Sequence, residues 1–363
     1  MTDLVGSPAA EQLQPWQDAR RTPPQYRTDA PATFEWWYFD AQLSGGQALI
    51  VAFVVEPDEA NARYSYRTQV FLMRPDGPAL RLNHRTFDDA ELSGDRPDVR
   101  IARSWLRADG DTYHVVVDPE DHEGFGVDVT ITGAVPGRVP PGGTDVILGG
   151  DDGFGWVNAI PRGTLAGTMT EDDQTVEVRG IAYHDHNWGT ATLGSAFDHW
   201  IWGRATVGPF TAVFLDVFPT QAYRTGESNV QSLYIASPDA VLLNIAGVDV
   251  ATVTASTGPN PDSRNRQSFF AEQVVFDTEH AGQRFTLEVT PARFIHDIDL
   301  LQDTTYLDAG ERSRALQMTV KPWYTEFVAA PVRLTVGRAD GSGEPQTFEG
   351  TGIVEFMDFH LAP

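Results

Sequence analysis

One stretch in the middle of the chain carries more reactive chemistry than any other part of the sequence. It reads Tyr183-His184-Asp185-His186-Asn187-Trp188-Gly189, so most of its side chains can move protons, form hydrogen bonds or stack on a ligand. A second stretch, Glu35 to Asp40, places a run of aromatic residues between two carboxylates. We expect the two stretches to form one site, which the rest of the chain positions.

Alternation along a strand divides the second stretch into two faces: Glu35, Trp37 and Phe39 on one, and Trp36, Tyr38 and Asp40 on the other. One interpretation is that the aromatic residues form core and the two acids lie in water at the strand ends, and for Asp40 we expect this outcome. Glu35 differs because it stands beside two tryptophans. A carboxyl packed against indole rings loses hydration and tends to keep its proton, which prepares a general acid.

The same alternation divides the central motif. If a strand runs through it unbroken, one face carries His184, His186 and Trp188, and the other carries Tyr183, Asp185 and Asn187. His184 and Asp185 can then enter one pocket only if the strand bends or ends there.

Three interpretations of the motif remain open. In the first, His184 and His186 bind a metal ion, with further ligands drawn from Asp198, His199, His296 or Glu355. No third ligand stands at a characteristic spacing, so we predict no metal. In the second, the motif is a structural latch: Asn187-Trp188-Gly189 turns the chain, Trp188 fills the bottom of a barrel and Asp185 caps backbone amides.

In the third interpretation Asp185 is an acid that donates or takes a proton in a pocket walled by tryptophans. Downstream, Trp200 and Trp202 share a strand face with Asp198 and extend the aromatic wall. Glu355 lies among aromatic residues near the carboxyl terminus, where it fits either a core edge or a binding site. A Gly-x-Ser-x-Gly nucleophile motif and glycine-rich phosphate motifs are absent from the sequence.

Composition excludes several functional classes. The net charge of −25 repels nucleic acid and anionic membrane surfaces, and the absence of cysteine excludes thiolate chemistry and disulfides. The longest apolar run, Ala48 to Val55, is far shorter than the roughly 20 residues of a membrane helix, so we predict no stable membrane insertion. The first residues lack a secretory signal pattern, and we predict a cytoplasmic protein.

Short runs rich in Val, Phe, Tyr and Leu, separated by Pro, Asp, Asn and Gly, predict an all-β fold. One such run spans Val99 to Arg107, whereas Gly133 to Gly155 is expected to be a long loop. The length favours two antiparallel β-barrel or sandwich domains side by side. We predict an N-terminal arm over residues 1–30 and β domains over 31–195 and 196–363. Each half ends in a glycine-containing strand, with Gly180 in the first and Gly350 and Gly352 in the second, which suits two related barrels.

These motifs resemble a known family. Glu-Trp-Trp-Tyr-Phe at Glu35 to Phe39, Tyr-His-Asp-His-Asn-Trp-Gly at Tyr183 to Gly189 and Trp-x-Trp-Gly at Trp200 to Gly203 are similar to the carotenoid 1,2-hydratase (hydroxyneurosporene synthase) superfamily. That superfamily of two-domain lipocalin-like proteins includes the lipocalin-like Diels-Alderases of fungal decalin biosynthesis. The fungal enzymes commonly carry Lys in the central motif, and His186 here favours the hydratase side.

The resemblance implies two lipocalin-like domains, no cofactor and a large apolar isoprenoid or polyene substrate. It implies acid-catalysed hydration or cyclisation of an alkene; the alternatives are a Diels-Alderase-type cyclase and a non-catalytic carrier. On this hypothesis Asp185 is the general acid, His184 and Asn187 orient it, and Glu35 or Tyr38 assists. The pocket would be shaped by Trp36, Trp37, Trp188, Trp200 and Trp202, with Glu355 in contact with substrate.

Overall fold

The computed structural model separates into two compact units, an N-terminal unit (Glu11–Val139 and Gly143–Ala191) and a C-terminal unit that includes Thr192–Pro363. The structure describes residues 13–29, 33–58, 61–77, 79–141, 145–149, 152–190, 192–223, 229–260, 268–302, 313, 315–316 and 322–359, without the side chains of 145–149 and 152. Among these residues, no helix is long and apolar enough to cross a membrane.

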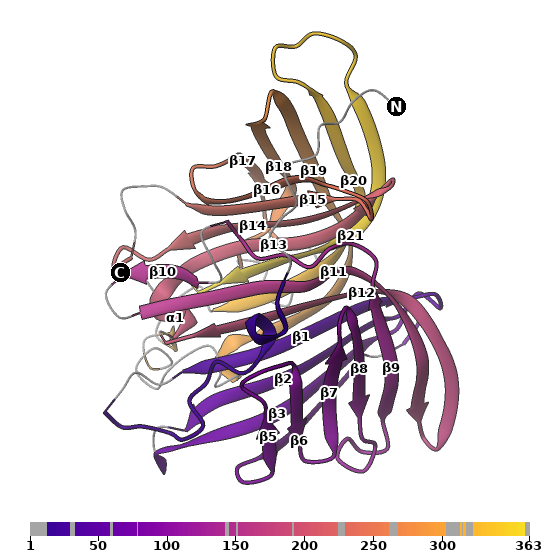
Figure 1. Ribbon diagram of the computed structural model, residues 1–363, viewed down its shortest axis with the longest axis vertical. Helices are drawn as coiled ribbons and strands as arrows, with labels where there is room; N and C mark the ends of the chain where they lie inside the picture. Colours follow the sequence, from indigo (N-terminus) through magenta and orange to yellow (C-terminus); the bar gives the residue numbers. More distant parts are fainter. Residues whose placement is uncertain are drawn as a thin grey trace. The chain divides into compact units, whose positions relative to one another are not determined.

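The N-terminal unit is built on one antiparallel sheet with the strand order β4-β3-β2-β1-β12-β11-β9-β8-β7-β6-β5, and β10 pairs with β11 (Figure 1). A short 3₁₀ helix, η1 (Pro15–Asp18), precedes it. The strands are β1 (Phe34–Leu43), β2 (Ala48–Asp58), β3 (Arg63–Met73), β4 (Leu80–Thr86), β5 (Ala90–Leu92), β6 (Asp98–Ile101), β7 (Ser104–Asp109), β8 (Thr112–Val117), β9 (Gly126–Gly133), β10 (Asp145–Gly149), β11 (Asp152–Glu171) and β12 (Gln174–Gly189).

The C-terminal unit repeats this plan with the order β16-β15-β14-β13-β21-β20-β19-β18-β17. In both sheets the first strand lies beside the last strand, and the next three strands form a meander on its other side. The elements are α1 (Leu193–Ala196), β13 (Phe197–Val207), β14 (Phe210–Pro219), β15 (Val230–Ala236), β16 (Val241–Val248), β17 (Thr252–Thr257), β18 (Ala271–His280), β19 (Gln283–Asp299), η3 (Leu300–Gln302), β20 (Trp323–Arg338) and β21 (Gln346–Asp358). The predicted all-β, lipocalin-like class is confirmed.

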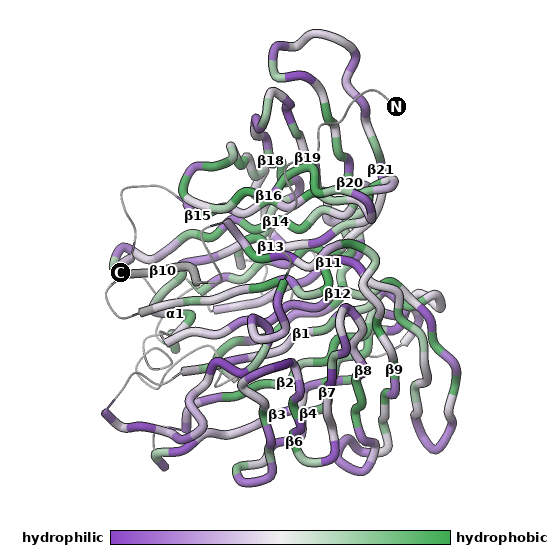
Figure 2. Tube along the Cα trace, viewed as in Figure 1, coloured by the Kyte–Doolittle hydropathy of each residue, from purple (hydrophilic) through white to green (hydrophobic). Residues whose placement is uncertain are grey.

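Each sheet has its own apolar core on one face. In the N-terminal unit the core includes Trp37 and Phe39 of β1 with Phe53 of β2, and in the C-terminal unit it includes Phe327 of β20 and Phe356 of β21. Figure 2 shows apolar residues along the strands and polar residues at many hairpin ends. Alternation therefore sends every second side chain of β1, β12, β13 and β21 to the face opposite the core.

Two predicted boundaries were wrong. The run from Val99 to Arg107 forms two strands, β6 and β7, because Ala102 has a φ of 51° and the chain turns there. The stretch from Gly133 to Gly155, predicted to be a loop, contains β10 and the beginning of β11. The beginning of β11 is stabilised by pairing with β12. No local sequence pattern predicts this pairing between distant segments.

Glycines on the last strand of each sheet allow close approach to the first strand. A Cβ atom at Gly180 of β12 would lie 2.5 Å from the carbonyl oxygen of Gln42 on β1. At Gly350 of β21 it would lie well inside contact distance of the carbonyl oxygen of Thr206 on β13. The glycines found in the sequence at the end of each half thus have the same steric role in both units.

We predict that Gly350→Ala destabilises the protein by about 1 to 3 kcal/mol, because the added methyl group forces β21 away from β13. The measurement is thermal and urea unfolding of the full chain. Gly153→Ala is the matched control, since a Cβ there meets nothing within 4 Å. Equal stability of the two variants would contradict the steric account.

Candidate functional site

Strand β12 runs unbroken through the central motif. It pairs with β1 from Gly180 to Gly189 without a register shift, and Tyr38 lies opposite Asp185. The proposed turn at Asn187-Trp188-Gly189 is therefore wrong, because these residues continue the strand. His184 and Asp185 point to opposite faces of the sheet, so His184 does not orient Asp185.

On the core face, His184 and His186 contact two buried carboxylates. His186 Nε2 lies 2.8 Å from Glu35 Oε1, and His186 Nδ1 lies 3.2 Å from Asp18 Oδ1. His184 Nε2 lies 3.2 Å from Asp18 Oδ2, and its Nδ1 donates to the backbone carbonyl of Tyr38 at 2.9 Å. We call Asp18, Glu35, His184 and His186 the core-face cluster.

Glu35 is surrounded by hydrogen-bond donors, contrary to the prediction that indole rings isolate it. Its carboxylate accepts hydrogen bonds from the backbone N–H groups of Arg21 (2.6 Å) and Thr22 (2.8 Å), from the Thr22 hydroxyl and from His186. Because all of these groups donate, Glu35 acts as an acceptor that anchors the N-terminal arm. This geometry does not suit a proton donor.

The buried charges of the core-face cluster compensate one another. Burial alone would raise the pKa of Asp18, but the neighbouring histidines hold it well below its usual range. Burial lowers the pKa of His186, yet the close Asp18 carboxylate and the hydrogen bond to Glu35 outweigh this and raise it. The His186 ring also stacks on Trp37, with centroids 4.5 Å apart, which favours the imidazolium.

Asp18 was not predicted from the sequence. It ends η1 and is fully buried, accepts a hydrogen bond from the Tyr113 hydroxyl, and its backbone carbonyl accepts one from Trp37 Nε1 at 3.0 Å. The arm around it shows no apolar period. The one available signal was an acidic residue directly after a tryptophan-containing turn, which is too common to identify a site.

On the opposite face, three donors surround Asp185. Its Oδ2 accepts hydrogen bonds from Trp156 Nε1 at 2.9 Å and the Tyr183 hydroxyl at 2.8 Å, and its Oδ1 accepts one from Asn187 Nδ2 at 2.9 Å. Asp185 is 5 % exposed. Burial raises the pKa of Asp185 to about 6, although these three hydrogen bonds oppose the shift. The carboxyl can therefore exchange a proton near neutral pH.

Buried polar residues beyond the donors hold them in place. The Tyr183 hydroxyl accepts a hydrogen bond from Asn158 Nδ2 at 2.7 Å, and Asn158 Oδ1 accepts one from Arg138 at 3.3 Å. Arg138 is fully buried, and its guanidinium lies 5.4 Å from the centroid of the Trp156 ring. Burial raises the pKa of Tyr183 well above its usual value, so the phenol keeps its proton and donates to Asp185.

The aromatic residues predicted for one pocket separate into different places. Trp36 and Tyr38 share the Asp185 face of β1 and are partly exposed, whereas Trp37 is buried in the core. Trp188 lies near the core-face cluster, with its ring 4.9 Å from His186 and 4.7 Å from the Arg21 guanidinium. We call Trp36, Tyr38, Trp156, Tyr183, Asp185 and Asn187 the Asp185 face.

Trp200, Trp202 and Glu355 belong to the C-terminal unit. Trp202 lies opposite Glu355 on neighbouring strands, and Trp200 Nε1 donates a hydrogen bond to Glu355 Oε1 at 2.8 Å. Glu355 is only partly buried. These three residues form a cluster of their own on the face of β13 and β21 opposite the core.

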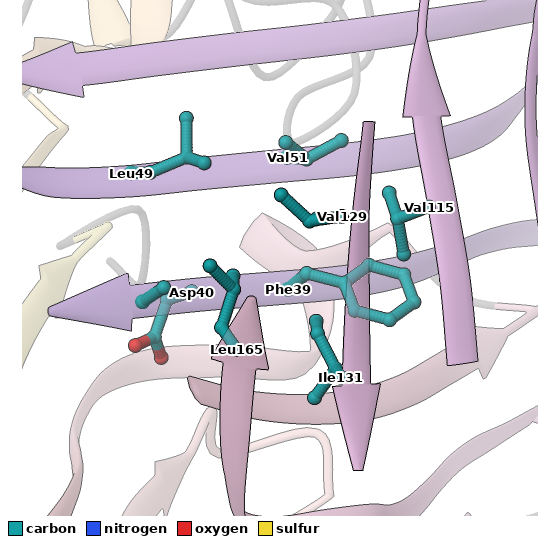
Figure 3. Close-up of a pocket in the computed structure, with 9 residues that line it drawn as sticks. Phe39, Asp40, Leu49, Val51, Val115, Val129, Ile131 and Leu165 are labelled. Atoms are coloured by element: carbon teal, nitrogen blue, oxygen red, sulfur yellow. The ribbon is translucent and has the colours of Figure 1, made fainter. Parts of the chain in front are cut away.

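A small cavity lies inside the N-terminal unit, on the core side of the sheet (Figure 3). Its volume is about 10 Å³, at the lower limit for one water molecule, and its lining is mainly apolar. It is lined by Phe39, Asp40, Ala41, Leu49, Val51, Val115, Val129, Ile131 and Leu165. The cavity is too small for an isoprenoid, so we place the candidate site on the Asp185 face. Within the described chain, no group of three or more His, Cys, Asp or Glu is arranged to hold a metal ion.

The core-face cluster predicts a characteristic pH dependence of stability. The lowered pKa of Asp18 stabilises the fold above about pH 4, and this contribution is lost as the pH falls further. The raised pKa of His186 stabilises it below about pH 6.5, and this contribution is lost as the pH rises through the folded-state value. Both contributions are complete only between these limits.

We therefore expect His186→Gln to lower the free energy of unfolding by about 3 to 5 kcal/mol at pH 5.5 and by less at pH 9. Urea unfolding at the two pH values measures this difference. His114→Gln is the control, because the His114 side chain pairs with Asp128 at the surface and is 44 % exposed. A loss that is the same at both pH values would contradict the charged cluster.

Comparison with known proteins places these motifs in context. A family model described as carotenoid hydratase CrtC matches residues 82–237, which include the central motif and Trp200 to Gly203. Hydroxyneurosporene dehydrogenase of Chlorobaculum tepidum is 24% identical over 214 residues, which are 49% of this chain and 55% of that protein. This match thus spans about half the length of that relative. The quinolone epoxide rearrangement protein asqO of Emericella nidulans is 26% identical over 272 residues, 67% of this chain and 72% of that protein.

Solved structures share the fold across nearly the whole chain. The crystal structure of CghA with Sch210972 has a TM-score of 0.59 at 16% identity and covers 95% of this chain and 97% of its own. Kievitone hydratase from Nectria haematococca has a TM-score of 0.56 at 10% identity, covering 98% and 95%. The resemblance to the carotenoid 1,2-hydratase superfamily of lipocalin-like proteins, predicted from the motifs, is confirmed.

Proposed function

We propose that the protein is a cofactor-free hydratase or cyclase that protonates an alkene of an apolar isoprenoid or polyketide substrate, with Asp185 as the general acid. The carrying observation is the Asp185 carboxyl, which is buried, has a pKa raised to about 6 and lies on a face with partly exposed aromatic residues. Such an acid is half protonated at about pH 6, and roughly a tenth of it remains protonated at pH 7, which is enough for general acid catalysis.

In the proposed reaction the alkene π electrons take the Asp185 proton, forming a C–H bond and a tertiary carbocation. The carboxylate left behind is stabilised by the hydrogen bonds from Trp156, Tyr183 and Asn187. Water then adds to the cation and returns a proton to the Asp185 carboxylate, which gives an alcohol and restores the acid. Attack by a second alkene of the substrate would instead give a cyclic cation, which loses a proton to the same carboxylate.

Partly exposed aromatic faces suit the cationic intermediate. Trp36 stacks on Phe34 with centroids 5.2 Å apart, and Tyr38 packs edge-on against Tyr183 at 6.4 Å. A cation over an aromatic face gains about 0.5 to 2 kcal/mol. We assign Trp36 and Tyr38 to substrate contact on this ground, and we propose a hydrophobic small molecule as the partner.

The names of the relatives support this class of chemistry. They include a carotenoid hydratase, quinolone epoxide rearrangement proteins and kievitone hydratase, so the reactions that these names give are hydration and rearrangement. The fold shared with CghA, solved with Sch210972, favours a pericyclic cyclase as the second candidate. In that case the same aromatic residues would confine a polyene in a reactive conformer, and no proton transfer would be needed.

We predict that Asp185→Asn abolishes hydration or proton-driven cyclisation, lowering kcat/KM at least a thousandfold, because an amide cannot supply the proton. In the unsubstituted protein kcat/KM should fall about tenfold per pH unit above pH 6, as the acid ionises. Turnover is measured by mass spectrometry with hydroxyneurosporene-type carotenoids, quinolone epoxides and kievitone precursors as the substrate panel.

Asp40→Asn is the matched control. The prediction that Asp40 is solvated at a strand end was wrong, because it lies within β1 opposite Tyr183 and is buried, on the same face of β1 as Tyr38. We expect Asp40→Asn to retain most activity. A pericyclic enzyme would slow only modestly on Asp185→Asn and show no alkaline limb. Turnover by Asp185→Asn at a rate near that of the unsubstituted protein would exclude Asp185 as the acid.

A further inference from the structure

A row of polar and aromatic side chains crosses four strands of the C-terminal unit. Trp202 of β13 lies opposite Glu355 of β21, Glu355 lies opposite Glu326 of β20, and Glu326 lies opposite His296 of β19. Direct cross-strand neighbours have Cβ atoms about 4.5 to 5.5 Å apart. The two carboxyl groups are therefore adjacent, on the face of the sheet opposite the core.

The two carboxyl groups differ in their hydrogen bonds. Glu355 accepts one from Trp200 Nε1 at 2.8 Å and another from the Tyr324 hydroxyl at 2.9 Å. Glu326 is fully buried, yet neither of its carboxylate oxygens accepts a hydrogen bond from any residue that the structure describes. His296 Nδ1 lies 3.2 Å from its Oε2 and is not aligned for a hydrogen bond.

An unsatisfied buried carboxylate is costly, and like charges on directly opposite residues are destabilising. Arg204 is buried two residues beyond Trp202 on the same face of β13, and the His296 ring contacts Glu326. Glu326 Oε1 lacks a hydrogen-bond donor, and this face already carries one buried cation, Arg204. An uncharged hydroxyl group meets that need without adding a further cation.

We propose that Glu326 and Glu355 form a binding site for the hydroxyl group of an apolar ligand. The hydroxyl hydrogen is donated to the Glu326 carboxylate, and the carbon skeleton packs against Trp200, Trp202 and Tyr324. This site stands on the contacts within the C-terminal unit and is independent of Asp185. Only the choice of an isoprenoid skeleton for the test rests on the proposed function.

The test compares geraniol, an isoprenoid alcohol, with the hydrocarbon myrcene and with geranylamine, using quenching of tryptophan fluorescence by each compound. Glu326→Gln should weaken geraniol binding at least tenfold and myrcene binding less than threefold. Glu349→Gln is the matched control and should leave geraniol affinity unchanged, because the Glu349 carboxylate pairs with Arg333 at the surface of the same unit. The proposed function is contradicted if Asp185→Asn retains near-normal turnover, whereas the hydroxyl site is contradicted by the binding measurements. The two failures are therefore distinguishable.

Three results would overturn the proposal: no geraniol binding to the unsubstituted protein, an equal loss for geraniol and myrcene on Glu326→Gln, or a larger loss for geranylamine than for geraniol. The last result would mean an ammonium site. Circular dichroism checks that Glu326→Gln is folded. If it is not folded, the same binding measurements are made on Glu355→Gln. Glu355 is only partly buried, so this substitution should be better tolerated by the fold.

Discussion

The unbroken course of β12 is the constraint on which the site depends. Because successive side chains of a strand point to opposite faces, adjacent residues of the central motif enter different environments. His184 and His186 face the core and two buried carboxylates, whereas Asp185 faces away from the core. Pairing with β1 on one side and β11 on the other fixes this division.

The division separates two requirements that conflict within one pocket. A carboxyl that donates a proton near neutral pH must be poorly solvated, and imidazolium groups beside it would lower its pKa. On the core face, the carboxylates of Asp18 and Glu35 stabilise the positive charge of His186. Glu35 also accepts hydrogen bonds from the backbone of the N-terminal arm, which attach the arm to the sheet. The hydrogen-bond partners of Asp185 are all neutral, and burial raises its pKa by more than these hydrogen bonds and the coulombic effect of His184 lower it.

The architecture could be predicted well because alternation and turn residues are local signals for strands and hairpins, and chain length indicates two domains. Strands on both sides of the motif, the resemblance and the candidate acid all came from such patterns. Asp18, Trp156, Asn158 and Arg138 were missed, since each reaches the site through pairing or packing between distant segments. Two of the donors around Glu35 are backbone N–H groups of the arm, which nearly every residue type carries, so the sequence could not predict them.

Both units carry an acid on the last strand, opposite an aromatic residue of the first: Asp185 opposite Tyr38, and Glu355 opposite Trp202.

In the proposed mechanism Asp185 transfers its proton to carbon. Turnover in heavy water, followed by mass spectrometry of the product, tests it most directly, because Asp185 exchanges its proton with solvent. We predict one carbon-bound deuterium in each product molecule. A product without carbon-bound deuterium would contradict the account and favour a pericyclic reaction.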